Sequence, residues 1–291
     1  MAGQSTLESW LTWAFSPSIS AILVTLIISL LSPILIHFYL YRKAQSKELP
    51  SFLLLGPSGA GKTSLLTLFA NGTSSKTHTS QTPSSALCAL PSTIRSTSDR
   101  YRSENDTSSQ PQFLLLDTPG HGKLRHHALA SLTTSTALKG LIYVVDSAAL
   151  SSSAGLTGAA EYLYDILLLL QKRHTGAKTS KDPQALPVMI AANKQDVFSS
   201  LPTQMVKTKL EEEIARVRAT RSKGLMDSGV GMEDAGEEER EWLGEYGAEA
   251  FGFGQMEEHG VEVVVVGGSV RGEGGEKGDV EGWWGWVGEN L

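Results

Sequence analysis

The hydrophobic positions of the chain form one long run near the N-terminus and a series of short runs after it. No residue from Ser9 to Tyr41 carries a formal charge, and the 22 residues 19–40 are predominantly apolar. A helix of that length spans roughly 33 Å, enough to cross a hydrocarbon core about 30 Å thick. The pattern therefore predicts a transmembrane helix over 19–41, kinked at Pro33.

The charges that flank this run predict its orientation. Arg42, Lys43 and Lys47 follow the run, and no lysine or arginine precedes it. Because cytosolic flanks carry the excess of basic residues, we expect 1–18 to be a short lumenal N-terminus and 49–291 to be cytosolic. A cleaved signal peptide would need a basic start and a shorter apolar stretch, and a buried soluble helix is rarely apolar on every face.

Beyond the span, short apolar runs alternate with amphipathic stretches, as in a doubly wound, mostly parallel α/β sheet. The predicted strands are 51–55, 85–90, 112–117, 141–146, 186–192 and 261–267. The predicted helices are 64–72, 160–174, 201–223 and 279–291. Segments near 73–111, 174–185 and 224–260 are polar or rich in glycine and glutamate, so we expect mobile insertions there.

Composition narrows the class of partner. The 291 residues hold 25 Lys and Arg against 31 Asp and Glu, a net charge of −6, which disfavours direct nucleic acid binding because phosphate backbones need clustered cations. A single cysteine, Cys88, excludes an internal disulfide and indicates a reducing compartment for the folded part.

The loop between the first predicted strand and helix carries the complete pattern G-x-x-x-x-G-K-[ST]. Glycines let backbone N–H groups converge on phosphate oxygens, and the following helix adds its dipole. The lysine would bridge the β- and γ-phosphates, and the threonine hydroxyl would ligate Mg²⁺. The predicted phosphate-binding residues are Gly56, Pro57, Ser58, Gly59, Ala60, Gly61, Lys62, Thr63 and Ser64.

A second motif follows the strand 112–117 and supplies further groups for the phosphates and the metal. Asp117 is placed to hold the Mg²⁺ shell through water, and the Gly120 N–H can reach a γ-phosphate because glycine has no side chain to block it. The metal ligands expected from the chain are Thr63, Asp117 and a threonine of the polar segment. Thr79 and Thr82 both lie at suitable distances along the chain, and Thr79 is favoured.

A third motif, Asn193-Lys194-Gln-Asp196, indicates that the base is guanine. Asp196 can accept two hydrogen bonds from guanine, whereas adenine would leave the buried carboxylate unpaired at a cost of about 1–3 kcal/mol. The stem of Lys194 would lie along the base. After the last strand, Ser269 and Val270 are placed to contact guanine O6 through their N–H groups. The expected cofactors are therefore GTP or GDP with Mg²⁺.

Hydrolysis is a separate prediction. Many small GTPases place a glutamine after D-x-x-G to orient the attacking water. Here the residue is His121, which can orient water, so His121, Lys62 and Gly120 are the candidate catalytic residues and intrinsic turnover is expected to be slow. Arg125 is a candidate arginine finger by proximity alone, and a surface charge is the simpler interpretation.

Several features beyond these motifs give the chain a resemblance to a known family. The span leads through a short link into the first strand, 117–121 reads Asp-Thr-Pro-Gly-His, and 210–222 is a helix that ends in Thr-Arg-Ser. The chain resembles the beta-subunit family of the signal recognition particle receptor, which consists of membrane-anchored small GTPases. This resemblance assigns the nucleotide-contacting switch segment to Thr77, His78, Thr79 and Ser80.

The resemblance implies a P-loop GTPase domain after one transmembrane helix, in the endoplasmic reticulum membrane. It implies that the GTP-bound switch regions dock the N-terminal domain of the receptor alpha subunit for co-translational protein targeting, with the ribosome and translocon as further candidate contacts. Two other functions stay open at this point. An Arf/Sar-like GTPase of vesicle transport would usually lack a true span, and a non-hydrolysing membrane scaffold would keep GTP only as a structural ligand.

Overall fold

The computed structural model describes residues 19–44, 49–94, 96–97, 110–134, 137–176, 185–227, 242–245, 247–272 and 278–291. The chain separates into two compact units, Met1–Glu48 and Leu49–Leu291.

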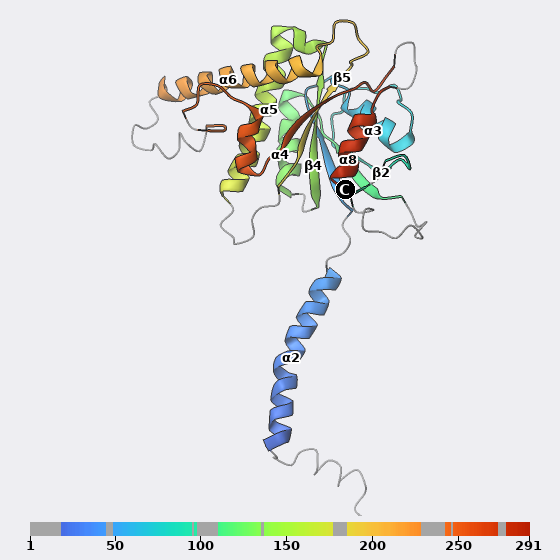
Figure 1. Ribbon diagram of the computed structural model, residues 1–291, viewed down its shortest axis with the longest axis vertical. Helices are drawn as coiled ribbons and strands as arrows, with labels where there is room; N and C mark the ends of the chain where they lie inside the picture. The colour runs from blue at the N-terminus through green and yellow to red at the C-terminus, as the bar shows by residue number, and fades with distance from the viewer. Residues whose placement is uncertain are drawn as a thin grey trace, which may run out of the picture. The chain divides into compact units, whose positions relative to one another are not determined.

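The first unit contains the helix α2, Ile19–Ala44, with Pro33 in its interior (Figure 1). Its large apolar side chains from Ile22 to Ile36 are 44 to 64% exposed. Within the ranges given above, no helix reaches the combination of length and apolarity needed to cross a membrane. The span predicted over 19–41 coincides with α2, and the predicted lumenal segment 1–18 lies outside the described residues.

The second unit is a six-stranded sheet in the order β2-β3-β1-β4-β5-β6. All neighbouring strands are parallel except β2, which pairs antiparallel with β3 at one edge. The strands are β1 Ser51–Leu55, β2 Ser84–Ala89, β3 Gln112–Asp117, β4 Leu138–Asp146, β5 Val188–Asn193 and β6 Val263–Gly267. The helices are α3 Lys62–Asn71, α4 Arg125–Thr134, α5 Ser153–Thr175, α6 Thr203–Asp227 and α8 Glu281–Glu289, with 3-10 turns η2 Gly122–Leu124, η3 Ala149–Ser151 and η4 Phe253–His259.

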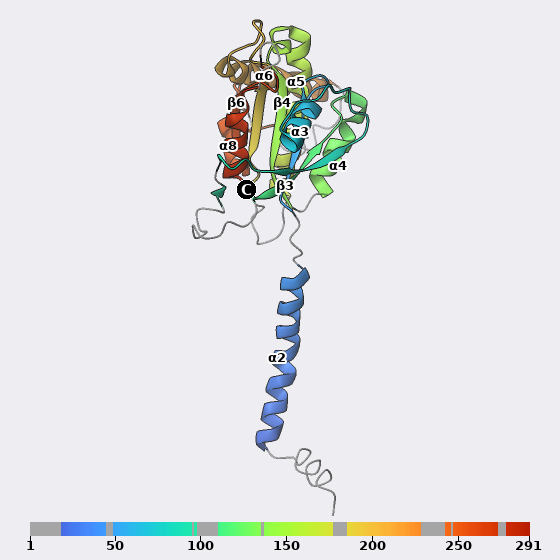
Figure 2. The ribbon, with the colours of Figure 1, turned by 90° about the vertical axis from the view of Figure 1, so that its right-hand side faces the viewer.

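Helices cover both faces of the sheet (Figures 1 and 2). Leu53 and Leu55 of β1 pack with α4, α5 and α6 on one face, while Phe52 and Leu54 pack with α3 and α8 on the other. The two-residue period of a strand explains the division, and burial on both faces explains why β1 is continuously apolar. This arrangement confirms the predicted doubly wound, mostly parallel α/β fold.

Most predicted elements are present, with shifted ends. The strands 51–55 and 112–117 have the predicted bounds, and the edge strand begins one residue earlier than predicted, at Ser84. The helix α5 begins seven residues before the predicted position 160, because the Ser152 hydroxyl accepts a hydrogen bond from the Gly155 N–H at 3.2 Å and caps it. The first turns of α5 consist mainly of small residues, so the pattern of apolar positions did not indicate this start.

The expectation of a mobile insertion over 224–260 is wrong for its second half. The helix α6 continues to Asp227, and residues 242–245 and 247–260 pack against the core, where Leu243, Phe253 and Met256 are at most 2% exposed. The buried Arg218 guanidinium of α6 holds this segment by donating hydrogen bonds to the carbonyls of Leu243 at 2.9 Å, Ala250 at 3.2 Å and Ala248. The apolar anchors are spaced too irregularly among glycines and glutamates to form a recognisable pattern.

Candidate functional site

The carboxyl ends of the parallel strands lie at one edge of the sheet, where ligands bind in open α/β folds. A cavity of about 420 Å³ opens there. It is lined by five segments that are separate in the sequence, and its lining residues are Ser58, Gly59, Gly61, Lys62, Thr63, Ser64, Thr77, His78, Thr79, Ser80, Gly120, Asn193, Lys194, Asp196, Val197, Val270 and Arg271. The structure thus brings most of the predicted site residues together.

The loop between β1 and α3 forms one wall of the cavity. Gly56, Gly59 and Gly61 have φ angles of 133°, 79° and 101°, a region that favours glycine. The loop ends at the N-terminus of α3, which has no side-chain cap. A helix N-terminus that opens into a polar cavity is suited to an anion.

Lys62 lies against this loop and is only 5% exposed. Its ammonium group donates hydrogen bonds to the carbonyl oxygens of Gly56 and Pro57, both at 2.8 Å. Burial lowers the pKa of Lys62 to about 8, although the nearby Asp117 carboxylate acts in the opposite direction. Among the described residues, the hydrogen-bond partners of the ammonium at the cavity wall are neutral carbonyl oxygens, so phosphate oxygens would be stronger acceptors for it.

Oxygen atoms suited to a hard cation gather beside Lys62. The Thr63 hydroxyl donates to Asp117 Oδ2 at 2.6 Å, and Ser80 Oγ lies 3.5 Å from each of these two oxygens. Asp117 Oδ1 is buried and has no hydrogen-bond partner among the described residues. Burial raises the pKa of Asp117, and the hydrogen bond from Thr63 partly opposes the rise. A buried carboxylate oxygen without a partner, next to two hydroxyls, fits Mg²⁺, which prefers oxygen ligands.

The switch segment contributes a different hydroxyl to this cluster from the one favoured by sequence. Thr79 lines the cavity, but the side chain hydrogen-bonded to Asp117 is that of Ser80. Thr82 is not among the lining residues. Thr77 lies at the other end of the segment, where its hydroxyl is 2.9 Å from that of Ser64 on α3.

Gly120 lies where no larger residue fits. A Cβ atom at this position would stand 2.5 Å from both the Gly56 carbonyl oxygen and the Lys62 ammonium nitrogen. Its neighbour His121 is exposed and lies outside the cavity lining, where its Nδ1 accepts a hydrogen bond from the Lys123 N–H at 3.3 Å. Of the three candidate catalytic residues, Lys62 and Gly120 therefore lie at the cavity in this structure and His121 lies beside it.

Arg125 points toward α5 and not toward the cavity. Its guanidinium stacks on the Tyr162 ring at 4.3 Å and donates to the Gly158 carbonyl at 3.4 Å. The expectation of a simple surface charge is therefore wrong, because the side chain is partly buried against the helix.

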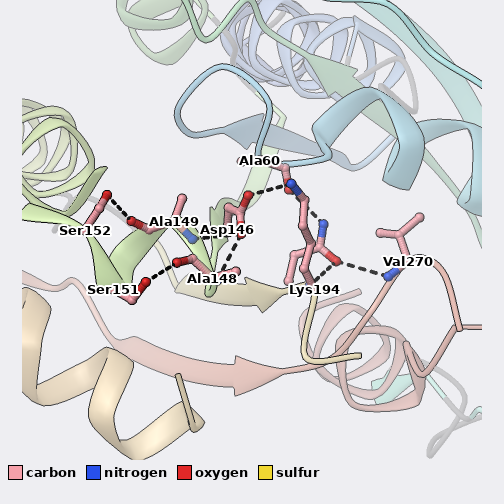
Figure 3. A network of polar contacts seen from close by, with 9 residues as sticks. Ala60, Asp146, Ala148, Ala149, Ser151, Ser152, Lys194 and Val270 are labelled. Carbon is pink, nitrogen blue, oxygen red and sulfur yellow. Dashed lines mark hydrogen bonds and ion pairs between the residues drawn. The ribbon is translucent and has the colours of Figure 1, made fainter. Parts of the chain in front are cut away.

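Asn193 connects three segments at the other end of the cavity, and its partners Ala60, Lys194 and Val270 are labelled in Figure 3. Its amide nitrogen donates to the Ala60 carbonyl at 2.7 Å, and its amide oxygen accepts from the N–H groups of Val270 at 3.0 Å and Lys194 at 2.8 Å. Asn193 is 2% exposed, so these bonds are sheltered from water. One buried side chain thus fixes the positions of three loops relative to one another: the phosphate loop, the Asn-Lys-Gln-Asp loop and the loop after β6.

Two of the predicted base-contacting residues border a second depression. Ser269 is buried and does not line the main cavity. It borders an adjoining polar depression together with Asp196, which lines both, and the full lining is Gln195, Asp196, Thr203, Gly267, Gly268, Ser269 and Asp279. Asp196 therefore stands at the junction, where the polar edge of a base could reach it.

Three residues at this end were missed by sequence reasoning. Val197 and Arg271 line the cavity, each directly after a predicted motif, and adjacency to the motifs could have indicated them. Asp146 ends β4 and forms an ion pair with Lys194, with 2.5 Å between Oδ2 and Nζ. An aspartate at the end of an apolar strand carries no motif by itself, so only the structure identifies it.

Comparisons with known proteins agree with this geometry. A family model described as "Signal recognition particle receptor beta subunit" matches residues 47–261. The subunit of that name from Saccharomyces cerevisiae is 32% identical over 250 residues, covering 85% of this chain and 86% of the relative.

Solved structures from Chaetomium thermophilum are similar as well. A complex described as SRb-GTP/SRX is 37% identical with a TM-score of 0.67, covering 83% of this chain and 100% of the other. A structure described as SRb-GDP-Mg is 40% identical with a TM-score of 0.60, covering 84% and 99%. The family model spans well over half of the residues, so the chain belongs to the family of signal recognition particle receptor beta subunits.

Proposed function

We propose that this chain is the GTPase subunit of a signal recognition particle receptor, which binds GTP or GDP with Mg²⁺ in the cavity. One observation carries the proposal: four motifs that are separate in the sequence line a single cavity, with Asn193 hydrogen-bonded to the loops on both sides of it. The related structures from Chaetomium thermophilum are described as complexes with GTP and with GDP and magnesium, which supports the same ligands here.

The phosphates lie along the loop 56–63 and the N-terminus of α3. There the backbone N–H groups and the Lys62 ammonium bind the phosphate oxygens. When bound, Mg²⁺ would supply positive charge that stabilises the phosphates. Thr63, Asp117 and a switch hydroxyl hold it, and the observed bond between Ser80 and Asp117 favours Ser80 over Thr79 for that third role.

Guanine selectivity follows from Asp196. Its carboxylate accepts hydrogen bonds from guanine N1–H and the 2-amino group, which adenine does not offer, while the stem of Lys194 lies along the base. The N–H groups of Ser269 and Val270, which the sequence placed at guanine O6, instead donate to the Asp279 carbonyl at 2.8 Å and to Asn193 Oδ1 at 3.0 Å, so the proposed selectivity does not depend on them. The expected discrimination against ATP is about 100-fold, the effect of leaving a sheltered charged group unpaired.

GTP hydrolysis is slow in the isolated chain. In the structure His121 is exposed and outside the cavity, so it must move to orient a water molecule at the γ-phosphate. Gly120, which directly precedes it, can respond to the γ-phosphate through its N–H group. Ordering of 118–125 by GTP then changes the surface that a partner meets.

The partner is the N-terminal domain of the receptor alpha subunit, bound in the GTP state through the switch segment 77–80 and the loop after β3. The related SRb-GTP structure holds a partner described as SRX, which supports this role. The uncharged stretch from Ser9 to Tyr41 and the exposed apolar side chains of α2 support an anchor in the endoplasmic reticulum membrane, with the second unit in the cytosol.

A competition experiment with the full-length protein in detergent micelles tests the nucleotide site. A GDP analogue with a fluorophore on the ribose is displaced by unlabelled GTP, GDP or ATP. We expect GTP and GDP to displace the probe at concentrations about 100-fold below those of ATP. Equal displacement by ATP would refute guanine recognition.

A capture experiment tests the partner. Full-length protein loaded with a non-hydrolysable GTP analogue or with GDP is presented to the purified N-terminal domain of the alpha subunit. Retention in the GTP-analogue state alone is expected, because only that state orders the switch segment. Equal retention in both states would contradict a GTP-gated contact.

A further inference from the structure

The acid at the end of β4 lies directly beside the base-binding end of the cavity. Asp146 is the register partner of Asn193 on the neighbouring strand β5, so both side chains emerge at the carboxyl edge of the sheet. Asp146 belongs to none of the nucleotide motifs, yet Figure 3 places it next to Lys194, whose side chain lines the cavity. The contact between these two residues therefore links β4 to the nucleotide site.

Both carboxylate oxygens of Asp146 have partners. Oδ1 accepts hydrogen bonds from the N–H groups of Ala148 at 3.0 Å and Ala149 at 3.1 Å. The carbonyls of the same two residues accept from the hydroxyls of Ser151 at 2.6 Å and Ser152 at 2.8 Å. These hydrogen bonds stabilise the turn formed by residues 146–149 and fix the position of Asp146 Oδ2. This oxygen accepts a hydrogen bond from Lys194 Nζ at 2.5 Å.

Lys194 has a backbone conformation that lysine rarely adopts. Its φ is 65°, and it is the one non-glycine residue with positive φ in the part of the chain that the structure describes. Glycine would take this conformation at lower cost, so the lysine side chain must contribute something that glycine lacks. Three contacts hold it: its N–H donates to Asn193 Oδ1 at 2.8 Å, its carbonyl accepts from the Val197 N–H at 3.1 Å, and its ammonium pairs with Asp146.

We propose that Asp146 is a positioning residue of the guanine site, which holds the ammonium of Lys194 so that the lysine methylene groups form a fixed wall for the base. Lysine stems pack against apolar surfaces while their charged ends bind elsewhere, and the flat face of a purine is such a surface. Pairing the ammonium with Asp146 also keeps it away from Asp196, whose carboxylate then stays free for the polar edge of the base. The inference rests on the proposed function, since it needs guanine nucleotide in the cavity.

A merely structural role for Asp146, as the acceptor that closes the 146–149 turn, would give a different result. The variant Asp146→Asn separates the two roles, because an amide oxygen can still accept from Ala148 and Ala149 while the amide nitrogen cannot accept from the Lys194 ammonium. The variant Lys194→Met keeps an apolar stem and removes the ion pair. The double variant then measures whether the two residues act through each other.

The experiment measures GDP affinity and the melting temperature of the full-length protein in detergent for the wild type, both single variants and the double variant. We expect each single variant to bind about tenfold more weakly, within the range that contacting residue pairs show, and the double variant to bind no more weakly than Lys194→Met. The control Asp165→Asn removes the ion pair between Asp165 and Arg221, away from the cavity, and should leave the affinity unchanged.

Two results would overturn the inference. One is an Asp146→Asn affinity equal to that of the wild type. The other is the same loss from Asp146→Asn in the wild type and in the Lys194→Met background. If Asp146→Asn unfolds the protein, Lys194→Met retains the complete turn and decides alone, because an unchanged affinity there would refute the role of the pair. A wild type that binds no guanine nucleotide would instead refute the proposed function.

Discussion

Replacing Asn193 by alanine would test how the cavity is held together. The change removes three hydrogen bonds. Those to Ala60 and Val270 are buried, so one carbonyl and one N–H are left there without a partner, whereas the Lys194 N–H is only partly buried and can bond to water. Each such group costs about 1–3 kcal/mol, so the free energy of unfolding should fall by about 2–6 kcal/mol. For a domain of this size that corresponds to a fall in Tm of about 5–20 °C.

Circular dichroism of the full-length protein in detergent, followed on heating, measures this loss, and nucleotide titration of the same samples measures the effect on binding. Asn290→Ala is the matched control, because it removes one hydrogen bond from the side-chain amide to the Trp286 carbonyl, 2.8 Å long, at the end of the last helix and away from the cavity. A melting temperature for Asn193→Ala within about 2 °C of the wild type would show that the three loops do not depend on this side chain.

Three further outcomes follow from the same geometry. GTP affinity should fall as the pH rises from 7 to 9, because the pKa of Lys62 in the free protein is about 8 and the neutral amine no longer pairs with phosphate. Lys62→Ala should bind GTP weakly and without this pH dependence. Nucleotide titration across that pH range measures both. Asp196→Asn should move the preference from GTP toward XTP, because xanthine presents an acceptor where guanine has a donor, and a competition assay that still favours GTP would argue against contact with the base. Arg218→Leu should lower the free energy of unfolding by about 1–3 kcal/mol, since the buried Leu243 carbonyl loses its donor. Its nucleotide affinity should stay within about twofold of the wild-type value. Chemical denaturation measures the first quantity, and nucleotide titration measures the second.

The fold and the phosphate loop could be predicted because their signals are local. The run 51–55 is apolar without interruption since it is buried on both faces, and the glycines at 56, 59 and 61 supply the positive φ angles that the loop needs. These properties depend on neighbouring residues, so a single sequence is enough to recognise them.

The details that sequence could not supply depend on contacts between distant segments. Asp146 is one of several acids at strand ends, and only its pairing with Lys194 distinguishes it. Ser80 and Thr79 are equivalent as hydroxyl donors, and the course of the switch segment decides which of them meets Asp117. Arg218 reads as an ordinary charge on an amphipathic helix, whereas it is 2% exposed and organises residues 242–250.

The hydrogen bonds of Asn193 also bear on how the protein emerges from the ribosome. Its partners Ala60 and Val270 are 133 and 77 positions away along the polypeptide. At a translation rate of about 5–20 residues per second, roughly 10–40 seconds separate the synthesis of these two partners. A nascent chain that carries the finished phosphate loop therefore lacks a working pocket until its last strand has left the exit tunnel, so ligand capture is one of the final events in the maturation of this polypeptide.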